Sequence, residues 1–231
     1  IDAFISPGEA YCAEMTEFLQ VPAERVHLVR TGVEIPENLP ETHEDGAFRP
    51  SFLSRLCEAK GLDTVCEAFA MMVESGHDDI VLGVAGQANA GDLAFWENCH
   101  KKLLERGLDE AIDFRGEVDE IEKAQFFRRA SVFCLPERYP EPRGVACLEA
   151  MAWGAPALVP DHGIFPEIAE LTGGARCLPA DNPEALVEAL EELYHDRDLQ
   201  ADMSHAAARG VADHFSAERM ALRTEELLRS L

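Results

Sequence analysis

The 231-residue chain lacks the long hydrophobic runs that place a protein in a membrane. It contains no stretch of about 18 apolar residues and no basic segment followed by an apolar one, so we expect neither a transmembrane helix nor a secretory signal. An initiator methionine is also missing, and the opening residues Ile1-Asp2-Ala3-Phe4-Ile5-Ser6 are typical of the middle of a strand. We therefore expect the sequence to be part of a longer protein.

Cysteine pairs and metal-ligand spacings are missing as well. The seven cysteines are an odd number without a Cys-x-x-Cys pair, and most stand among apolar residues, as Cys134 does. This pattern predicts unpaired, mostly buried thiols in a cytoplasmic protein and argues against a disulfide framework. The eight histidines show no spacing typical of a metal site, so we expect no metal ligands.

Basic residues are scarce. The chain has 20 Lys and Arg against 44 Asp and Glu, which gives a net charge of −24. Such a surface repels nucleic acid, so we exclude nucleic acid as an electrostatic partner. If the ligand is an anion, a few well-placed cations must attract it against the net field of the chain.

The order of the predicted elements indicates the fold class. Short apolar segments alternate with helical patterns of about 10 to 15 residues. The predicted strands are 3–6, 26–30, 48–53, 80–85, 112–115, 131–135, 157–160 and 175–178, and the predicted helices are 9–19, 61–75, 92–106, 119–130, 145–153, 165–171, 183–195, 199–212 and 217–231. This alternation predicts an α/β protein with a doubly wound parallel sheet, in which ligands bind beyond the carboxyl ends of the strands.

Composition also suggests how the chain is divided. Residues 36–47 are rich in proline and charged residues and predict a linker. Residues 1–35 then form a single βαβ remnant of a preceding domain, residues 48–215 the main domain, and residues 216–231 a C-terminal helix.

The most informative motif runs from Glu141 through Pro142-Arg143-Gly144 to Glu149. It places one carboxylate in a loop and a second one eight residues later, in the first turns of a predicted helix. A loop carboxylate beside exposed N–H groups and a helix N-terminus suits a ligand that carries both hydroxyls and phosphates. Taken alone, the two glutamates could equally be solvated surface charges.

Three further segments follow predicted strands. Arg55 and Lys60 stand five residues apart in one loop, as expected if both bind a diphosphate, although two ordinary surface cations are the alternative. Gly86 follows the next strand and, by itself, is best explained as a tight connection. The backbone of residues 115–118 follows the fifth strand and could hold a planar base edge-on.

Together these motifs resemble the C-terminal half of the retaining family-4 glycosyltransferases of GT-B fold. In chain order they are Arg55, Lys60-Gly61, Gly86, Phe114-Arg115-Gly116-Glu117-Val118, Leu135-Pro136-Glu137, Glu141-x7-Glu149-Ala150-Met151-Ala152-x-Gly154-x-Pro156 and Glu167. The similarity covers about residues 48–215, and residues 1–34 resemble the last βαβ piece of the family's N-terminal half. The resemblance implies a Rossmann-like domain that binds a nucleotide-sugar donor.

The resemblance also implies a role for each residue. Arg55 and Lys60 would bind the diphosphate and stabilise the leaving nucleotide, and Glu141 would hold hydroxyls of the donor sugar as the third catalytic residue. Glu149 would accept hydrogen bonds from the ribose. The remaining donor-binding positions would be Gly86, the backbone of Arg115 to Val118 around the base, Arg143 as a third cation, and the N–H groups of Gly144 and Val145 at the distal phosphate.

The expected reaction transfers a sugar to an acceptor with retention of configuration, without a cofactor or a divalent metal. The acceptor, a sugar or a lipid, would be held by an N-terminal domain absent from this chain, so we expect the chain alone to turn over little or no donor. A peripheral membrane location of the full-length protein is compatible with this role.

Pro142-Arg143 departs from the family's usual Gly-Phe-Gly, because proline fixes φ and removes an N–H. A GT-B epimerase or phosphorylase and a non-catalytic nucleotide-binding module are the alternatives.

Overall fold

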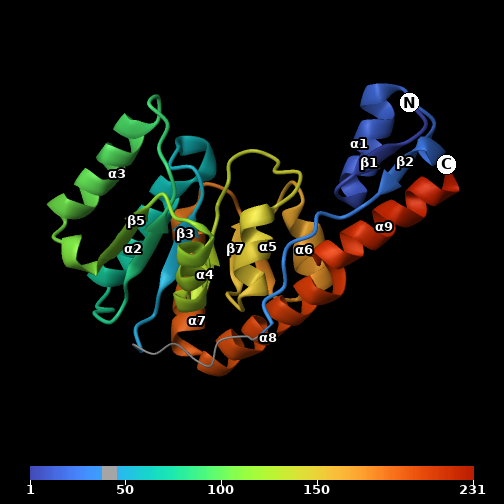
Figure 1. Ribbon diagram of the computed structural model, residues 1–231. Coiled ribbons are helices and arrows are strands. Elements are labelled where there is room, and N and C mark those ends of the chain that lie inside the picture. The colour runs from blue at the N-terminus through green and yellow to red at the C-terminus, as the bar shows by residue number, and fades with distance from the viewer. Residues whose placement is uncertain (38–45) are drawn as a thin grey trace.

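The computed structural model describes residues 1–37 and 46–231, and its main part is a six-stranded parallel sheet with helices on both faces (Figure 1). The strand order is β5-β4-β3-β6-β7-β8. The strands are β3 (Pro50–Leu53), β4 (Leu82–Ala85), β5 (Ile112–Gly116), β6 (Val132–Cys134), β7 (Ala157–Pro160) and β8 (Ala175–Leu178). The chain adds strands in one direction from β3 to β5 and in the other from β6 to β8. This is the doubly wound, Rossmann-like α/β fold that the alternation predicts, and the prediction is confirmed.

The central strands are buried because helices cover both of their faces. All residues of β4, β6 and β7 are buried, whereas the edge strands β5 and β8 are partly exposed. This explains why the central strands are continuous apolar runs instead of alternating patterns. Contacts join α2 to α3 and α7 on one face and α4 to α5 on the other. The helices are α2 (Leu62–Glu74), α3 (Leu93–Glu105), α4 (Glu120–Arg129), α5 (Val145–Ala152), α6 (Phe165–Thr172), α7 (Pro183–His195) and α8 (Arg197–His214).

The N-terminal strands and the helix between them form a βαβ unit with a two-stranded sheet of its own. Strands β1 (Phe4–Ser6) and β2 (Val26–Leu28) pair in parallel, and α1 (Glu9–Leu19) connects them. The unit lies beside the last helix, α9 (Ala217–Ser230), away from the main sheet (Figure 1). Val33 joins the unit to the residues before α9, because its N–H donates to Phe215 O (2.8 Å). The proposed domain limits stay a prediction, and most of the predicted 36–47 linker lies outside the described residues.

Several element ends differ from the sequence prediction by a few residues. The predicted helix 199–212 spans Arg197–His214, since the Asp196 side chain accepts a hydrogen bond from the Leu199 N–H and caps the helix earlier. The predicted strand 26–30 ends at Leu28, where the three-residue partner β1 ends. All seven cysteines are free and five are buried, as predicted. In the described part of the chain, no helix is long and apolar enough to cross a membrane.

Two glycines with nearly the same positive φ allow the packing of the loop after β3 to be tested. Gly61 has φ 74° and Gly107 has φ 75°. A Cβ atom at Gly61 would lie 2.1 Å from Pro136 O, whereas a Cβ atom at Gly107 would meet nothing within 4 Å. Gly107→Ala should lower the free energy of unfolding by about 1 kcal/mol for the left-handed conformation alone. Gly61→Ala should cost about 2 kcal/mol more because of the collision. Urea unfolding of both variants checks this, and equal losses would contradict it.

Candidate functional site

Four loops meet at the carboxyl edge of the sheet, the upper edge in Figure 1. Backbone hydrogen bonds tie them together: Leu56 N donates to Gln87 O (3.0 Å), Gly86 N to Gly116 O (2.7 Å), and Arg138 N to Ala59 O (2.9 Å). The loops after β3, β4, β5 and β6 therefore form one connected rim. This is the edge at which doubly wound sheets bind ligands.

Lys60 lies at the centre of this rim, at the end of the short 3₁₀ helix Glu58–Lys60. The residue is only 8% exposed, and its Nζ contacts Glu137 Oε1 and, at 3.2 Å, Glu141 Oε2. The ammonium also lies 4.7 Å from the centre of the Tyr139 ring. Burial opposes the charge on Lys60, but Glu137, Tyr139 and Glu141 outweigh burial and raise the pKa of Lys60 above its ordinary value. Lys60 is therefore a buried, fully charged cation.

Glu137 follows β6 after Leu135 and Pro136 and is 1% exposed. Burial, with a contribution from Glu141, raises its pKa to about 7, against the opposing effects of Lys60 and Arg55. Its Oε1 contacts Lys60, whereas its Oε2 is buried and has no hydrogen-bond partner among the described residues. Glu137 therefore titrates near neutrality inside the site.

Glu141 is an ionised hydrogen-bond acceptor held from several sides. Its Oε2 accepts from Lys60 Nζ and from the Tyr139 hydroxyl (3.2 Å each), and its Oε1 accepts from Arg143 N (3.3 Å). Its backbone O accepts from Ile164 N (2.9 Å). Burial opposes the charge, but Lys60 outweighs burial, so the pKa of Glu141 lies below its ordinary value. The carboxylate can accept hydrogen bonds from a ligand without first losing a proton.

Glu149 lies in a different ion pair. It stands on α5, and its Oε1 accepts from Lys123 Nζ on α4 at 2.8 Å. The two glutamates of the motif thus pair with two different lysines. Gly144 and Val145 begin α5 between them, where the first N–H groups of a helix lack partners within the helix and carry its positive dipole end.

The other predicted cations differ in whether their side chains form ion pairs. Arg55 and Arg143 are exposed, and neither guanidinium pairs with a carboxylate in residues 1–37 and 46–231. Arg115 instead binds Asp113 with both arms, Nε at 2.5 Å and Nη2 at 3.0 Å. The structure therefore does not bring the Arg115 side chain to Lys60. Arg115 and Val118 line a cavity of about 180 Å³ together with Arg49, Asp113, Glu122, Gln125, Phe126 and Arg129.

Metal ligands do not gather at this rim. Within the described residues, no three His, Cys, Asp or Glu side chains lie close enough together to hold a metal ion. The groups that could attract an anion here are the side chains of Arg55, Lys60 and Arg143 and the start of α5.

The sequence matches the model of the family described as glycosyl transferases group 1 over residues 41–210. The chain belongs to this family. The membership inferred from the ordered motifs is therefore confirmed.

Relatives of this glycosyltransferase domain include transferases with different names. D-inositol 3-phosphate glycosyltransferase of Streptomyces bingchenggensis is 26% identical over 239 residues, covering 98% of this chain and 52% of the relative. The lipopolysaccharide core biosynthesis mannosyltransferase LpsB of Rhizobium meliloti is 30% identical over 171 residues, covering 72% of this chain and 47% of the relative. The chain thus spans about half the length of the curated relatives it matches.

Solved structures share the fold of the glycosyltransferase domain. Anabaena Alr3699/HepE in complex with UDP has a TM-score of 0.87 at 20% identity, covering 100% of this chain and 64% of that chain. Sucrose-phosphate synthase from Thermosynechococcus elongatus has a TM-score of 0.85 at 20% identity, covering 99% and 58%. At this level of identity the likeness establishes the fold.

Sequence reasoning assigned no role to several side chains that organise the glycosyltransferase site. Glu137 could have been found by the rule that pointed to Arg55, because it also follows a buried strand. Lys123, Arg138 and Tyr139 gave no such signal, since their partners depend on tertiary packing.

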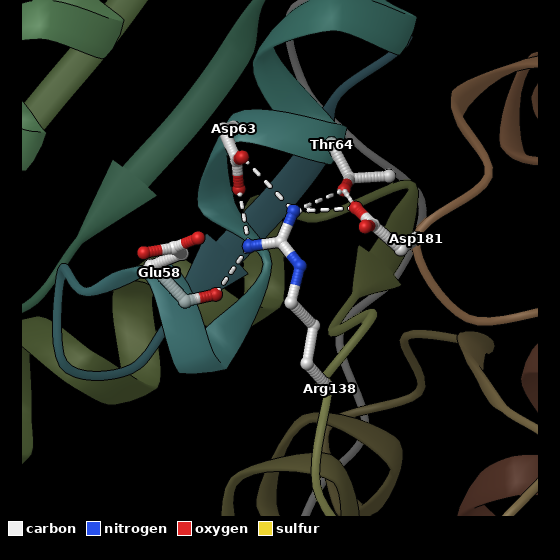
Figure 2. Close-up of polar contacts among 5 residues, drawn as sticks. All are labelled: Glu58, Asp63, Thr64, Arg138 and Asp181. Carbon is white, nitrogen blue, oxygen red and sulfur yellow. Dashed lines mark hydrogen bonds and ion pairs between the residues drawn. The ribbon is translucent and has the colours of Figure 1, made fainter.

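Arg138 braces the loop that carries Glu137 and Glu141 (Figure 2). It binds Asp63 through two bonds of 2.9 Å, and it also donates to Asp181, to Thr64 Oγ1 and to the backbone O of Glu58. The loop after β6 is thereby joined to the start of α2 and to the loop after β8. Burial opposes the charge on Arg138, but Asp63 and Asp181 outweigh burial and raise its pKa further.

Removing this brace should destabilise the domain. Arg138→Ala deletes the bidentate pair and leaves Asp63 and Asp181 facing each other, which should cost about 2 kcal/mol. Arg176→Ala is the matched control, since Arg176 also binds one carboxylate with both arms, Glu192 at the surface, and should change stability little. Urea unfolding compares the two variants. An equally small loss at Arg138 would show that the brace contributes nothing.

Proposed function

We propose that this chain is the donor-binding half of a retaining glycosyltransferase that transfers a hexose from a nucleotide-sugar to an acceptor. The observation that carries the proposal is the buried Lys60 ammonium beside the ionised Glu141 at the carboxyl edge of the sheet. A cation and an acceptor at one point suit a ligand that combines phosphates with sugar hydroxyls. The likeness to a structure that contains UDP supports a nucleotide ligand.

The diphosphate would be bound by both side chains and backbone. Lys60 supplies a fixed charge, and Arg55 is exposed and free to close on the phosphates from the same loop. The N–H groups of Gly144 and Val145 at the start of α5 add the positive end of a helix dipole. Arg143, exposed beside them, offers a further cation. These groups gather positive charge at one place on a strongly acidic chain.

The hydroxyls would be held by the two glutamates of the motif. Glu141 keeps an ionised carboxylate next to Lys60, and we assign it to the donor sugar. Glu149, four residues into α5, is assigned to the ribose, with Lys123 fixing its carboxylate. Gly86 and the backbone of residues 115–118 would border the base.

The chemistry follows from the charges. As the bond between the sugar and the diphosphate breaks, negative charge develops on the leaving phosphate, and Lys60 and Arg55 stabilise it. Because Lys60 and Arg55 supply this positive charge, the proposed reaction needs neither a divalent metal nor a cofactor. Glu141 would hold the sugar while the acceptor attacks on the face that the diphosphate leaves, which retains the configuration.

Donor binding tests the phosphate assignment. Titration calorimetry with UDP-glucose and GDP-mannose, in the presence of EDTA, should detect binding of at least one of them. Arg55→Ala should weaken that binding about tenfold or more, since a charge-assisted hydrogen bond contributes about 1.5 to 3 kcal/mol. Lys60→Ala should weaken it at least as much. Lys101→Ala, at an exposed position on α3, is the control and should bind normally. If neither nucleotide-sugar binds, the donor-site assignment is wrong.

Turnover tests whether this chain binds the donor while an N-terminal half holds the acceptor. This chain, given a nucleotide-sugar and a sugar or lipid acceptor, should bind the donor and form little or no glycoside. The physical reason is that transfer requires an acceptor hydroxyl held in line with the donor, and we assign that task to an N-terminal half. Product analysis by mass spectrometry checks for glycoside, free sugar and epimerised donor. Robust transfer by this chain alone would contradict the division.

A further inference from the structure

Glu137 has no task in the proposed donor contacts, yet its position is unusual. It is the only fully buried acidic residue in the described part of the chain. One carboxylate oxygen holds Lys60, while the other is enclosed without any hydrogen-bond partner among the described residues. A buried charged oxygen without a partner is costly, whereas a protonated one is much less so.

Protonation of Glu137 changes the net charge of the groups around Lys60. With Glu137 ionised, the charges of Lys60 and Arg55 are balanced by those of Glu137 and Glu141, so these four groups carry no net charge. With Glu137 protonated, the same four groups carry one positive charge. An arriving diphosphate repels the Glu137 carboxylate and competes with it for Lys60, so both effects favour the protonated form.

We infer that Glu137 is a positioning residue that holds Lys60 through Oε1 and takes up a proton on Oε2 when the nucleotide-sugar binds. This inference rests on the proposed donor site. The proton comes from solvent and is returned when the nucleotide leaves. Glu137 thereby couples the affinity of the site for its donor to pH.

The surroundings of Glu137 support this assignment. Its pKa is raised to about 7 by burial and by Glu141, against Lys60 and Arg55. The pKa of Glu141 is lowered and that of Lys60 is raised, so neither of these two groups changes charge near neutrality. The titratable and charged groups that act on Glu137 are Arg55, Lys60, Glu141 and Cys147 on α5. Tyr139 contacts Lys60 and Glu141, and His162 lies in the loop after β7, whose Ile164 N donates to the Glu141 backbone.

The direction of the pH effect follows from linkage. Because the anion raises the pKa of Glu137 further, the complex holds more protons than the free protein. Affinity is therefore highest below the pKa of free Glu137 and falls as the pH rises through it. With a pKa of about 7 in the free protein, the donor should bind about fivefold more weakly at about pH 8 than at about pH 7.

Calorimetry of the whole chain measures the proton directly. A nucleotide-sugar such as UDP-glucose or GDP-mannose is the suitable probe, because its two esterified phosphates do not titrate near neutrality. Binding is measured at about pH 7.5 in two buffers that differ in ionisation enthalpy. The wild-type chain should take up between about half and about three quarters of a proton for each molecule bound. Binding without proton uptake would overturn the inference and leave the proposed donor site standing.

Three variants identify the group that takes up the proton. Glu137→Gln keeps an acceptor for Lys60 but cannot titrate, so proton uptake should vanish, the affinity should no longer depend on pH, and binding at about pH 8 should exceed that of the wild type. Glu137→Asp keeps a carboxyl group and should restore part of the pH dependence. Glu58→Gln, the same change at an exposed position in the loop that carries Lys60, should behave as the wild type.

The remaining outcomes separate the two proposals. Proton uptake that persists in Glu137→Gln would assign it to another group, such as His162, and overturn the inference. If the wild-type chain binds neither nucleotide-sugar, the proposed function and this inference both fall.

Discussion

The enclosure of Lys60 between Glu137 and Glu141 is the interaction on which this site depends. An ammonium taken out of water must be paired and hydrogen-bonded, and here two carboxylates and an aromatic ring do this. The lysine comes from the loop after β3 and both glutamates come from the loop after β6. These loops meet because β3 and β6 are neighbours at the point where the strand order reverses. The topology of the sheet thus brings the charged groups together.

Irregular loops can hold such a site only if they are fixed on several sides. Gly61, the residue after Lys60, packs closely against Pro136 and so fixes the loop after β3 against the loop after β6. Arg138 joins the loop after β6 to α2 and to the loop after β8. The few cations near the site have different roles. Lys123 is paired with Glu149 and supports its carboxylate, while Lys60 and the exposed Arg55 and Arg143 are the cations that we assign to the diphosphate. On a chain with a net charge of −24, this division leaves cations where they can act.

Much of the fold was predictable because it follows from local patterns. Continuous apolar runs gave the buried strands, and the residues after them gave the rim positions 55, 60, 86 and 141. The ion pairs were not predictable, because their partners lie far apart in sequence, 77 residues for Lys60 and Glu137 and 75 for Arg138 and Asp63. No helical or strand period relates such residues. The ion pair of Arg115 was not predicted either, although its partner Asp113 is only two residues away in β5.

The N-terminal βαβ unit contacts the main domain where Glu141 is supported. Ile164 N donates to the Glu141 backbone, and the Ile164 side chain fills the space that a Cβ atom at Gly8 would need. One turn further on, Glu167 accepts from Glu9 N and from Arg30 Nε at 2.7 Å each. The start of α6 therefore has the N-terminal unit on one side and the acceptor carboxylate on the other. The N-terminal unit and the Glu141 backbone therefore contact the same short segment at the start of α6. This segment thus connects the N-terminal βαβ unit to the carboxylate that we assign to the donor sugar.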